Sequence, residues 1–112
     1  MKIDLKDKYT LSKGFRFLTG SQALVRLAIV QRRRDNKRKI KSAGYISGYR
    51  GSPLGTYDKQ VLQAKKYLEN YNVYFQPGIN EELAATSLWG TQQANFYGEG
   101  KFDGVFGIWY GK

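Results

Sequence analysis

The stretch that decides the expected fold is residues 76–90, which read Gln-Pro-Gly-Ile-Asn-Glu-Glu-Leu-Ala-Ala-Thr-Ser-Leu-Trp-Gly. A turn at Pro77-Gly78 separates an apolar run from a segment rich in small residues. Asn80 is suited to cap a helix, because its side-chain oxygen can accept a backbone N–H of the first turn. Glu81 and Glu82 follow where the helix dipole favours negative charge. The stretch predicts a strand, a turn and then a helix.

Working outward, the sequence alternates between strand-like and helix-like segments. Thr19 and Gln22 form the pattern of a capping box, a hydroxyl followed three residues later by an amide. Strands are expected over residues 43–49, 72–76 and 102–112, and helices over residues 23–34, from 56–58 onward, and from 80 to about 97. This alternation predicts an α/β fold with a parallel sheet and helices on both faces. Residues 1–18 are expected to be an irregular lead-in.

Ligands bind at the carboxyl ends of the strands in such sheets. The turn Gly48–Gly55 follows the first expected strand, residues 77–82 follow the second, and Trp109–Gly111 end the third. The glycine-rich turn could hold a phosphate or a carboxylate with Arg50, or be a plain tight turn. Residues 80–82 could likewise be helix capping alone. The convergence of these segments predicts a site at this edge of the sheet.

Composition narrows the chemistry. The 112 residues contain no cysteine and no histidine, which leaves Asp, Glu, Lys and Tyr for proton transfer and excludes disulfides and thiolate metal sites within the chain. No apolar run reaches the roughly 20 residues that a membrane span needs. The amino terminus also lacks the apolar core of a signal peptide. We therefore expect a cytoplasmic protein that does not enter a membrane.

Positive charge is concentrated in one region. The net charge is +10, and seven of the basic residues lie between Arg32 and Lys41. A small basic nucleic-acid-binding domain is therefore an alternative function, because phosphate neutralisation drives such binding. No aromatic residues interleave with these cations to stack on bases. We favour a solvated helix end and loop, and we do not expect nucleic acid as a partner.

The last eleven residues indicate that the chain is part of a longer protein. They form an apolar strand without a following helix or polar tail, and such a strand is normally buried within a sheet. We expect residues 19–112 to be a partial α/β domain that is truncated at its carboxyl terminus. An open apolar edge also predicts that the isolated piece folds poorly and self-associates.

Three segments carry a resemblance to a known family. They are residues 17–26 (Phe-Leu-Thr-Gly-Ser-Gln-Ala-Leu-Val-Arg), residues 46–55 (Ile-Ser-Gly-Tyr-Arg-Gly-Ser-Pro-Leu-Gly) and residues 75–86 (Phe-Gln-Pro-Gly-Ile-Asn-Glu-Glu-Leu-Ala-Ala-Thr). The chain resembles the amino-terminal segment of the fused indolepyruvate ferredoxin oxidoreductases, within the thiamine diphosphate-dependent 2-oxoacid:ferredoxin oxidoreductases. The resemblance covers most of the chain. It implies a partial pyrimidine-type thiamine diphosphate-binding domain.

The resemblance also implies roles for particular residues. A glutamate at the head of the helix after the second strand bonds the pyrimidine N1′ in this family, and the matching residue is Glu81, with Glu82 the less favoured neighbour. We expect Asn80 to belong to the cofactor-binding residues as well. Ser52, a hydroxyl just before a proline, matches a position on the substrate side and could bond the 2-oxoacid, with Gly51 beside it. From its charge, Arg50 could attract the substrate carboxylate.

The implied activity is oxidative decarboxylation of an aryl 2-oxoacid such as indolepyruvate, giving an acyl-CoA and reduced ferredoxin. Thiamine diphosphate is the expected cofactor, while Mg²⁺ and [4Fe-4S] clusters are expected in the missing part of the protein. The expected partners are the 2-oxoacid, coenzyme A, ferredoxin and the remaining domains, in a homo-oligomer, and the fragment alone is expected to be inactive. A non-catalytic scaffold subunit that keeps the fold is a further alternative.

Overall fold

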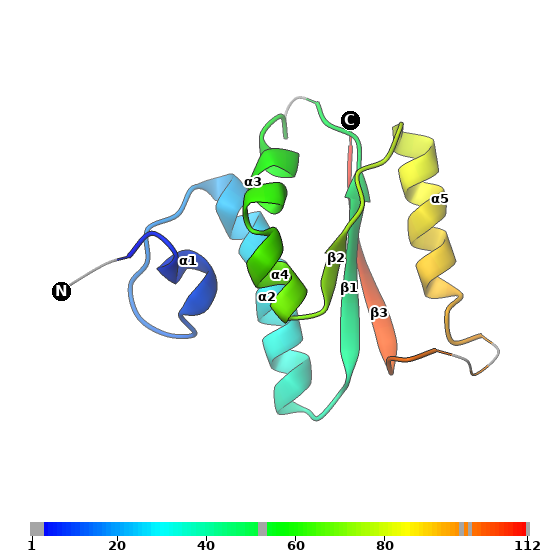
Figure 1. The fold of residues 1–112 in the computed structure, drawn as a ribbon, viewed down its shortest axis with the longest axis horizontal. Helices are drawn as coiled ribbons and strands as arrows, with labels where there is room; N and C mark the ends of the chain where they lie inside the picture. Colours follow the sequence, from blue (N-terminus) through cyan, green and yellow to red (C-terminus); the bar gives the residue numbers. More distant parts are fainter. Residues whose placement is uncertain (1–3, 52–53, 97, 99, 112) are drawn as a thin grey trace.

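The computed structural model describes residues 4–51, 54–96, 98 and 100–111. Its elements form three layers, with α1 to α4 on one side of the sheet and α5 on the other (Figure 1). In chain order they are α1 (Asp7–Thr10), α2 (Gly20–Lys37), β1 (Ser42–Gly48), α3 (Tyr57–Gln63), α4 (Lys65–Asn70), β2 (Val73–Phe75), α5 (Glu81–Gln92) and β3 (Gly104–Tyr110).

The sheet is parallel, with β1 in the centre and the strand order β2-β1-β3. Gly44 pairs with Val73 of β2, and Gly48 pairs with Tyr110 at the far end of β3. The connections β1–β2 and β2–β3 run in opposite directions across the sheet, and their helices lie on opposite faces (Figure 1). Both crossovers therefore have the same hand, as parallel connections require. The predicted α/β fold with helices on both faces is confirmed.

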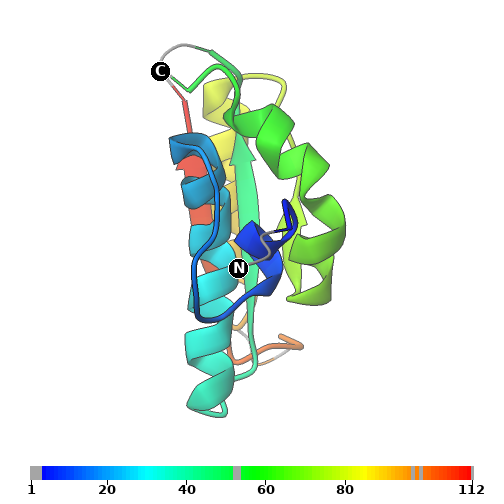
Figure 2. The ribbon, with the colours of Figure 1, turned by 90° about the vertical axis from the view of Figure 1, so that its left-hand side faces the viewer.

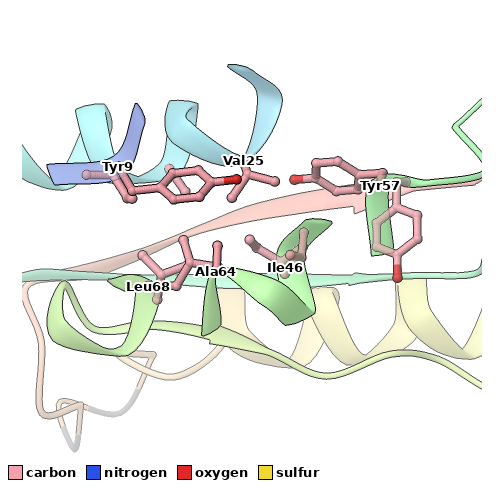
Figure 3. Close-up of a cluster of buried hydrophobic side chains, with 11 residues drawn as sticks. Tyr9, Val25, Ile46, Tyr57, Ala64 and Leu68 are labelled. Atoms are coloured by element: carbon pink, nitrogen blue, oxygen red, sulfur yellow. The ribbon is translucent and has the colours of Figure 1, made fainter. Parts of the chain in front are cut away.

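The main core lies between the sheet and α2 to α4 (Figures 2 and 3). Six of the seven residues of β1 are buried and the seventh is partly buried. This is the pattern of a central strand that is covered on both faces. Ile46 of β1 meets Val25 of α2, Ala64 between α3 and α4, and Leu68 of α4 in one apolar cluster (Figure 3). This cluster fixes the sheet against the helices.

Helix α2 buries only part of the wide apolar stripe that its sequence predicts. Its capping box of Thr19 and Gln22 is confirmed, with both reciprocal hydrogen bonds formed. The predicted stripe combined Leu24, Leu27 and Ala28 with Val25 and Ile29, but the Leu24 and Leu27 side chains are 42% and 56% exposed. The buried residues of the helix are Val25, Ala28, Ile29 and Arg32. Apolar residues occur on both sides of this helix, and the side that packs against the sheet is the one that is buried.

Three boundaries also differ from prediction. The lead-in contains the helical turn α1, and its buried Tyr9 packs with Val25 of α2 and with the Tyr67 ring of α4 (Figure 3). The helix expected from residue 56 is two helices that meet at Ala64. Helix α5 ends at Gln92, short of the expected residue 97. The Asn95 amide beyond that end donates to the carbonyl oxygens of Phe102 and Asp103, so tertiary bonds replace helical ones there.

Candidate functional site

The carboxyl ends of the three strands meet at one edge, the upper edge in Figure 1. Backbone hydrogen bonds tie them together. The N–H of Gly78, in the segment after β2, donates to the Gly48 carbonyl oxygen at 2.9 Å, and the N–H of Tyr49 donates to the Tyr110 carbonyl oxygen at 3.1 Å. The predicted convergence of the three strand ends is confirmed. We call this edge the rim.

Gly78 brings the start of α5 to the rim. A Cβ at this position would lie 2.7 Å from Cβ of Ala84 and 3.2 Å from the Gly48 carbonyl oxygen. No larger residue fits without moving α5 or the end of β1. The close approach therefore explains why a glycine follows Pro77 at this turn, and it sets the first turn of α5 directly beside the central strand.

Asn80 caps α5 as predicted. Its backbone is extended, and its Oδ1 accepts a hydrogen bond of 2.8 Å from the N–H of Leu83. The carboxamide oxygen is therefore engaged within the chain, which leaves the NH₂ group as the end of the side chain that could face a ligand. The cap fixes where the helix begins and so fixes the place of the two carboxylates that follow.

Glu81 and Glu82 differ in their surroundings. Glu81 is partly buried, whereas Glu82 is exposed. A Cβ on Gly111 would lie 3.2 Å from Cγ of Glu81, so the Glu81 side chain extends over the carboxyl end of β3. Among the described residues, no hydrogen bond or ion pair reaches the Glu81 carboxylate. The capped start of α5 therefore places the Glu81 side chain beside the carboxyl end of β3.

The turn after β1 is described only in part. Arg50 is exposed, and its guanidinium lies 5.4 Å from the ring centroid of Tyr49. Gly51 is partly buried beside it. Ser52, the candidate substrate-binding hydroxyl, lies outside the described residues together with Pro53. Within the described part of the chain, no contact joins Arg50 to Glu81, so these two candidates share the rim without touching.

Two tyrosines lie beneath the rim: Tyr110, which the sequence places at this edge as the end of the third strand, and Tyr57, which the sequence did not indicate. The rings of Tyr57 and Tyr110 meet edge to face, with centroids 5.1 Å apart. Burial, with a smaller contribution from Tyr110, raises the pKa of Tyr57 to about 12. Burial, with a smaller contribution from Asp58, raises the pKa of Tyr110 to about 12. Both phenols stay protonated near neutral pH, so the buried side chains beneath the rim carry no charge there.

The basic cluster is not simply a solvated helix end. Arg32 is 3% exposed, and it donates to the Tyr71 carbonyl oxygen at 2.7 Å, to Ser42 Oγ at 2.8 Å and to Asn36 Oδ1 at 3.0 Å. Arg33 donates to the Tyr71 hydroxyl and to the carbonyl oxygens of residues 9–11. The prediction of a solvated cluster is wrong for these two arginines, which join α2 to other elements.

Comparisons with protein-family models, with curated proteins and with solved structures found no match. Over the described ranges, no three acidic side chains lie close enough together to hold a metal ion. No helix in those same ranges is both long enough and apolar enough to cross a membrane. The case for a function therefore depends on the rim and on the resemblance of its segments.

Proposed function

We propose that this chain is the aminopyrimidine side of a thiamine diphosphate-dependent oxidoreductase. The enzyme would oxidatively decarboxylate an aryl 2-oxoacid such as indolepyruvate, giving an acyl-CoA and reduced ferredoxin. The observation that supports this most strongly is the Glu81 carboxylate, which is held at the rim by a capped helix and has no partner among the described residues. The family that the sequence resembles needs a glutamate at this point of the fold.

The place of Glu81 at the head of α5 supports binding of the pyrimidine end of the cofactor. Thiamine diphosphate supplies the carbanion stabilisation that decarboxylation of a 2-oxoacid needs. Glu81 would hold a proton at the pyrimidine N1′, and its partial burial would strengthen that hydrogen bond. An aspartate would be one methylene shorter, and a glutamine could bond but not share the proton. The proposal therefore requires a glutamate at position 81, and not an aspartate or a glutamine.

The diphosphate end is proposed to bind elsewhere in the enzyme, as the resemblance implies. Mg²⁺ at such sites is usually held by one or two carboxylates together with the phosphates themselves. Residues outside this domain would have to hold the diphosphate, its Mg²⁺ and the iron–sulfur clusters. The chain by itself is then proposed to be inactive, and to require the remaining domains of the same enzyme.

The substrate would approach from the turn after β1. Arg50 is exposed and next to the rim, and a guanidinium can pair with a carboxylate through two parallel hydrogen bonds. Gly51 follows Arg50 in the sequence, and the hydroxyl of the next residue, Ser52, is proposed to bond the 2-oxoacid. This assignment of the substrate side depends on the resemblance and on the charge of Arg50.

The test is an assay of the polypeptide encoded by the complete gene. It should reduce ferredoxin when supplied with indolepyruvate, coenzyme A, thiamine diphosphate and Mg²⁺. Glu81→Gln should abolish this turnover, since the amide cannot share a proton with N1′. Glu82→Gln is the matched control, and it should retain activity because that side chain is exposed. Turnover by the Glu81→Gln variant at the wild-type rate would reject the assignment.

A further inference from the structure

The first turn of α5 has a second attachment to the sheet besides its cap. The indole Nε1 of Trp109, in β3, donates a hydrogen bond of 3.1 Å to the carbonyl oxygen of Glu81. A carbonyl at this position of a helix also accepts from the N–H four residues later, and an sp² oxygen has lone pairs for both donors. The indole therefore joins the last part of β3 to the residue that carries the proposed catalytic carboxylate.

Gly111 leaves the room that this arrangement needs. A Cβ on Gly111 would lie 2.6 Å from two atoms of the Trp109 ring and 3.2 Å from Cγ of Glu81. The indole and the Glu81 side chain thus both pass close to the same glycine backbone. Trp109, Gly111 and Glu81 form one contact group at the carboxyl end of β3.

The tryptophan is not held there by burial alone. The Trp109 side chain is 45% exposed, so its hydrogen bond is a specific attachment and not a consequence of core packing. Trp89, which lies on α5, is 66% exposed, and no hydrogen bond joins its indole N–H to a described residue. The two tryptophans therefore differ in the hydrogen bond more than in their exposure, which makes Trp89 a matched control.

We propose that Trp109 is a positioning residue for Glu81. Its hydrogen bond fixes the rotation of the first turn of α5, and Gly111 lets the Glu81 side chain extend over the end of β3. Trp109 would touch neither substrate nor cofactor. The inference rests on the proposed function, because it concerns how this chain presents a carboxylate to the aminopyrimidine.

The hydrogen bond itself is tested in the complete gene product, where the variants Trp109→Phe and Trp89→Phe assign the two indole signals. Selective ¹⁵N labelling of tryptophan reports the two indole N–H groups separately by NMR. The Trp109 N–H should exchange with water more slowly than the Trp89 N–H, since only the former is bonded. Equal exchange rates for the two groups would overturn the proposal, whether or not the complete protein binds a cofactor.

The positioning role is tested in the complete gene product. Trp109→Phe keeps an aromatic ring but removes the donor, and we expect it to weaken thiamine diphosphate binding about 3- to 10-fold, the size of one hydrogen bond. The KM for the 2-oxoacid should change less than twofold, which a general loss of structure would not allow. Trp89→Phe should leave both quantities unchanged.

Gly111→Ala provides a second variant if Trp109→Phe fails to fold. The added methyl would displace the indole while keeping the donor, and it should weaken cofactor binding in the same direction. Wild-type cofactor affinity in both variants, together with loss of binding in Glu81→Gln, would overturn this inference and leave the proposed function intact. Absence of thiamine diphosphate binding by the wild-type protein would reject both.

Discussion

Nη1 of Arg32 donates a hydrogen bond of 2.8 Å to Oγ of Ser42, which joins the middle of α2 to the first residue of β1. The Ser42 hydroxyl in turn donates to the Asp35 carboxylate. A buried guanidinium is thus paired with a carboxylate through a serine, and each of its three nitrogen atoms donates a hydrogen bond. Burial of this charge is tolerated because its donors have partners.

Removing Arg32 should destabilise the fold strongly. Arg32→Ala leaves the Tyr71 carbonyl, Ser42 and Asn36 without their donor, and we expect a loss of at least about 3 kcal/mol in the free energy of unfolding. Arg34→Ala, two residues along the same helix at an exposed position, should change it by less than about 0.5 kcal/mol. Urea unfolding at low protein concentration measures both. Similar stabilities of the two variants would contradict the structural role of Arg32.

Any nucleic-acid binding by the basic cluster should involve at most five phosphate contacts, which limits how steeply it depends on salt. Of the seven basic residues from Arg32 to Lys41, two are occupied within the chain, which leaves five for phosphates. If DNA binds through all five, the slope of log K against log salt is about −4.5. We expect any binding to be weak, non-specific and no steeper than this. A steeper slope, with specific binding at physiological salt, would favour the nucleic-acid alternative.

The isolated chain should self-associate through the edge of β3. This strand pairs only with β1 in the described sheet, and its uncovered edge is flanked by Leu27 on one face and Trp89 on the other, 56% and 66% exposed. Open apolar edges promote association between chains. Light scattering should show oligomers that dissociate in a Leu27→Lys, Trp89→Lys variant.

Leu62→Lys is the control for that experiment. Leu62 is 60% exposed, but it lies on α3, away from β3. We expect this variant to associate as the wild-type chain does. A monomeric wild-type chain with a sharp cooperative melt would contradict both this prediction and the expectation, made from the sequence, that the piece folds poorly alone.

Alkaline pH should destabilise the fold through Tyr57. The folded-state pKa of about 12 exceeds the value of about 10 in an unfolded chain, so the folded chain holds the proton more tightly. The associated stability is fully present below pH 10 and is lost as pH rises through 12. Tyr57→Phe should reduce this loss, whereas Tyr74→Phe, at a half-exposed position, should not.

The same substitution tests the buried hydroxyl near neutral pH. The Tyr57 hydroxyl is buried without a hydrogen-bond partner among the described residues. Removing an unsatisfied buried group costs no hydrogen bond, so Tyr57→Phe should be neutral or stabilising by up to about 1 kcal/mol at pH 7. A large destabilisation at that pH would show that the hydroxyl makes a bond in solution. Thermal unfolding of the two proteins provides the measurement.

Local signals predicted most of the fold. The capping box at Thr19, the N-cap at Asn80 and the apolar run of β1 each depend on residues close together in the sequence, and each is confirmed. The convergence of the strand ends followed from the strand–helix alternation. These features needed no information about which elements pack together.

The features that were missed depend on distant residues. Val25 of α2 is buried and Leu27 is not, because Val25 is on the side of the helix that packs against the sheet. The burial of Arg32 depends on Tyr71, 39 positions away. The Trp109 hydrogen bond to Glu81 likewise spans 28 positions. Sequence patterns within one element carry no information about such pairings.

The central claim is that Glu81 points at the cofactor from the rim. A crystal structure of the complete gene product with thiamine diphosphate bound tests it directly. We predict a Glu81 carboxylate oxygen about 2.8 Å from the pyrimidine N1′, a normal hydrogen-bond distance. A Glu81 side chain directed into solvent, with another group bonded to N1′, would contradict the claim.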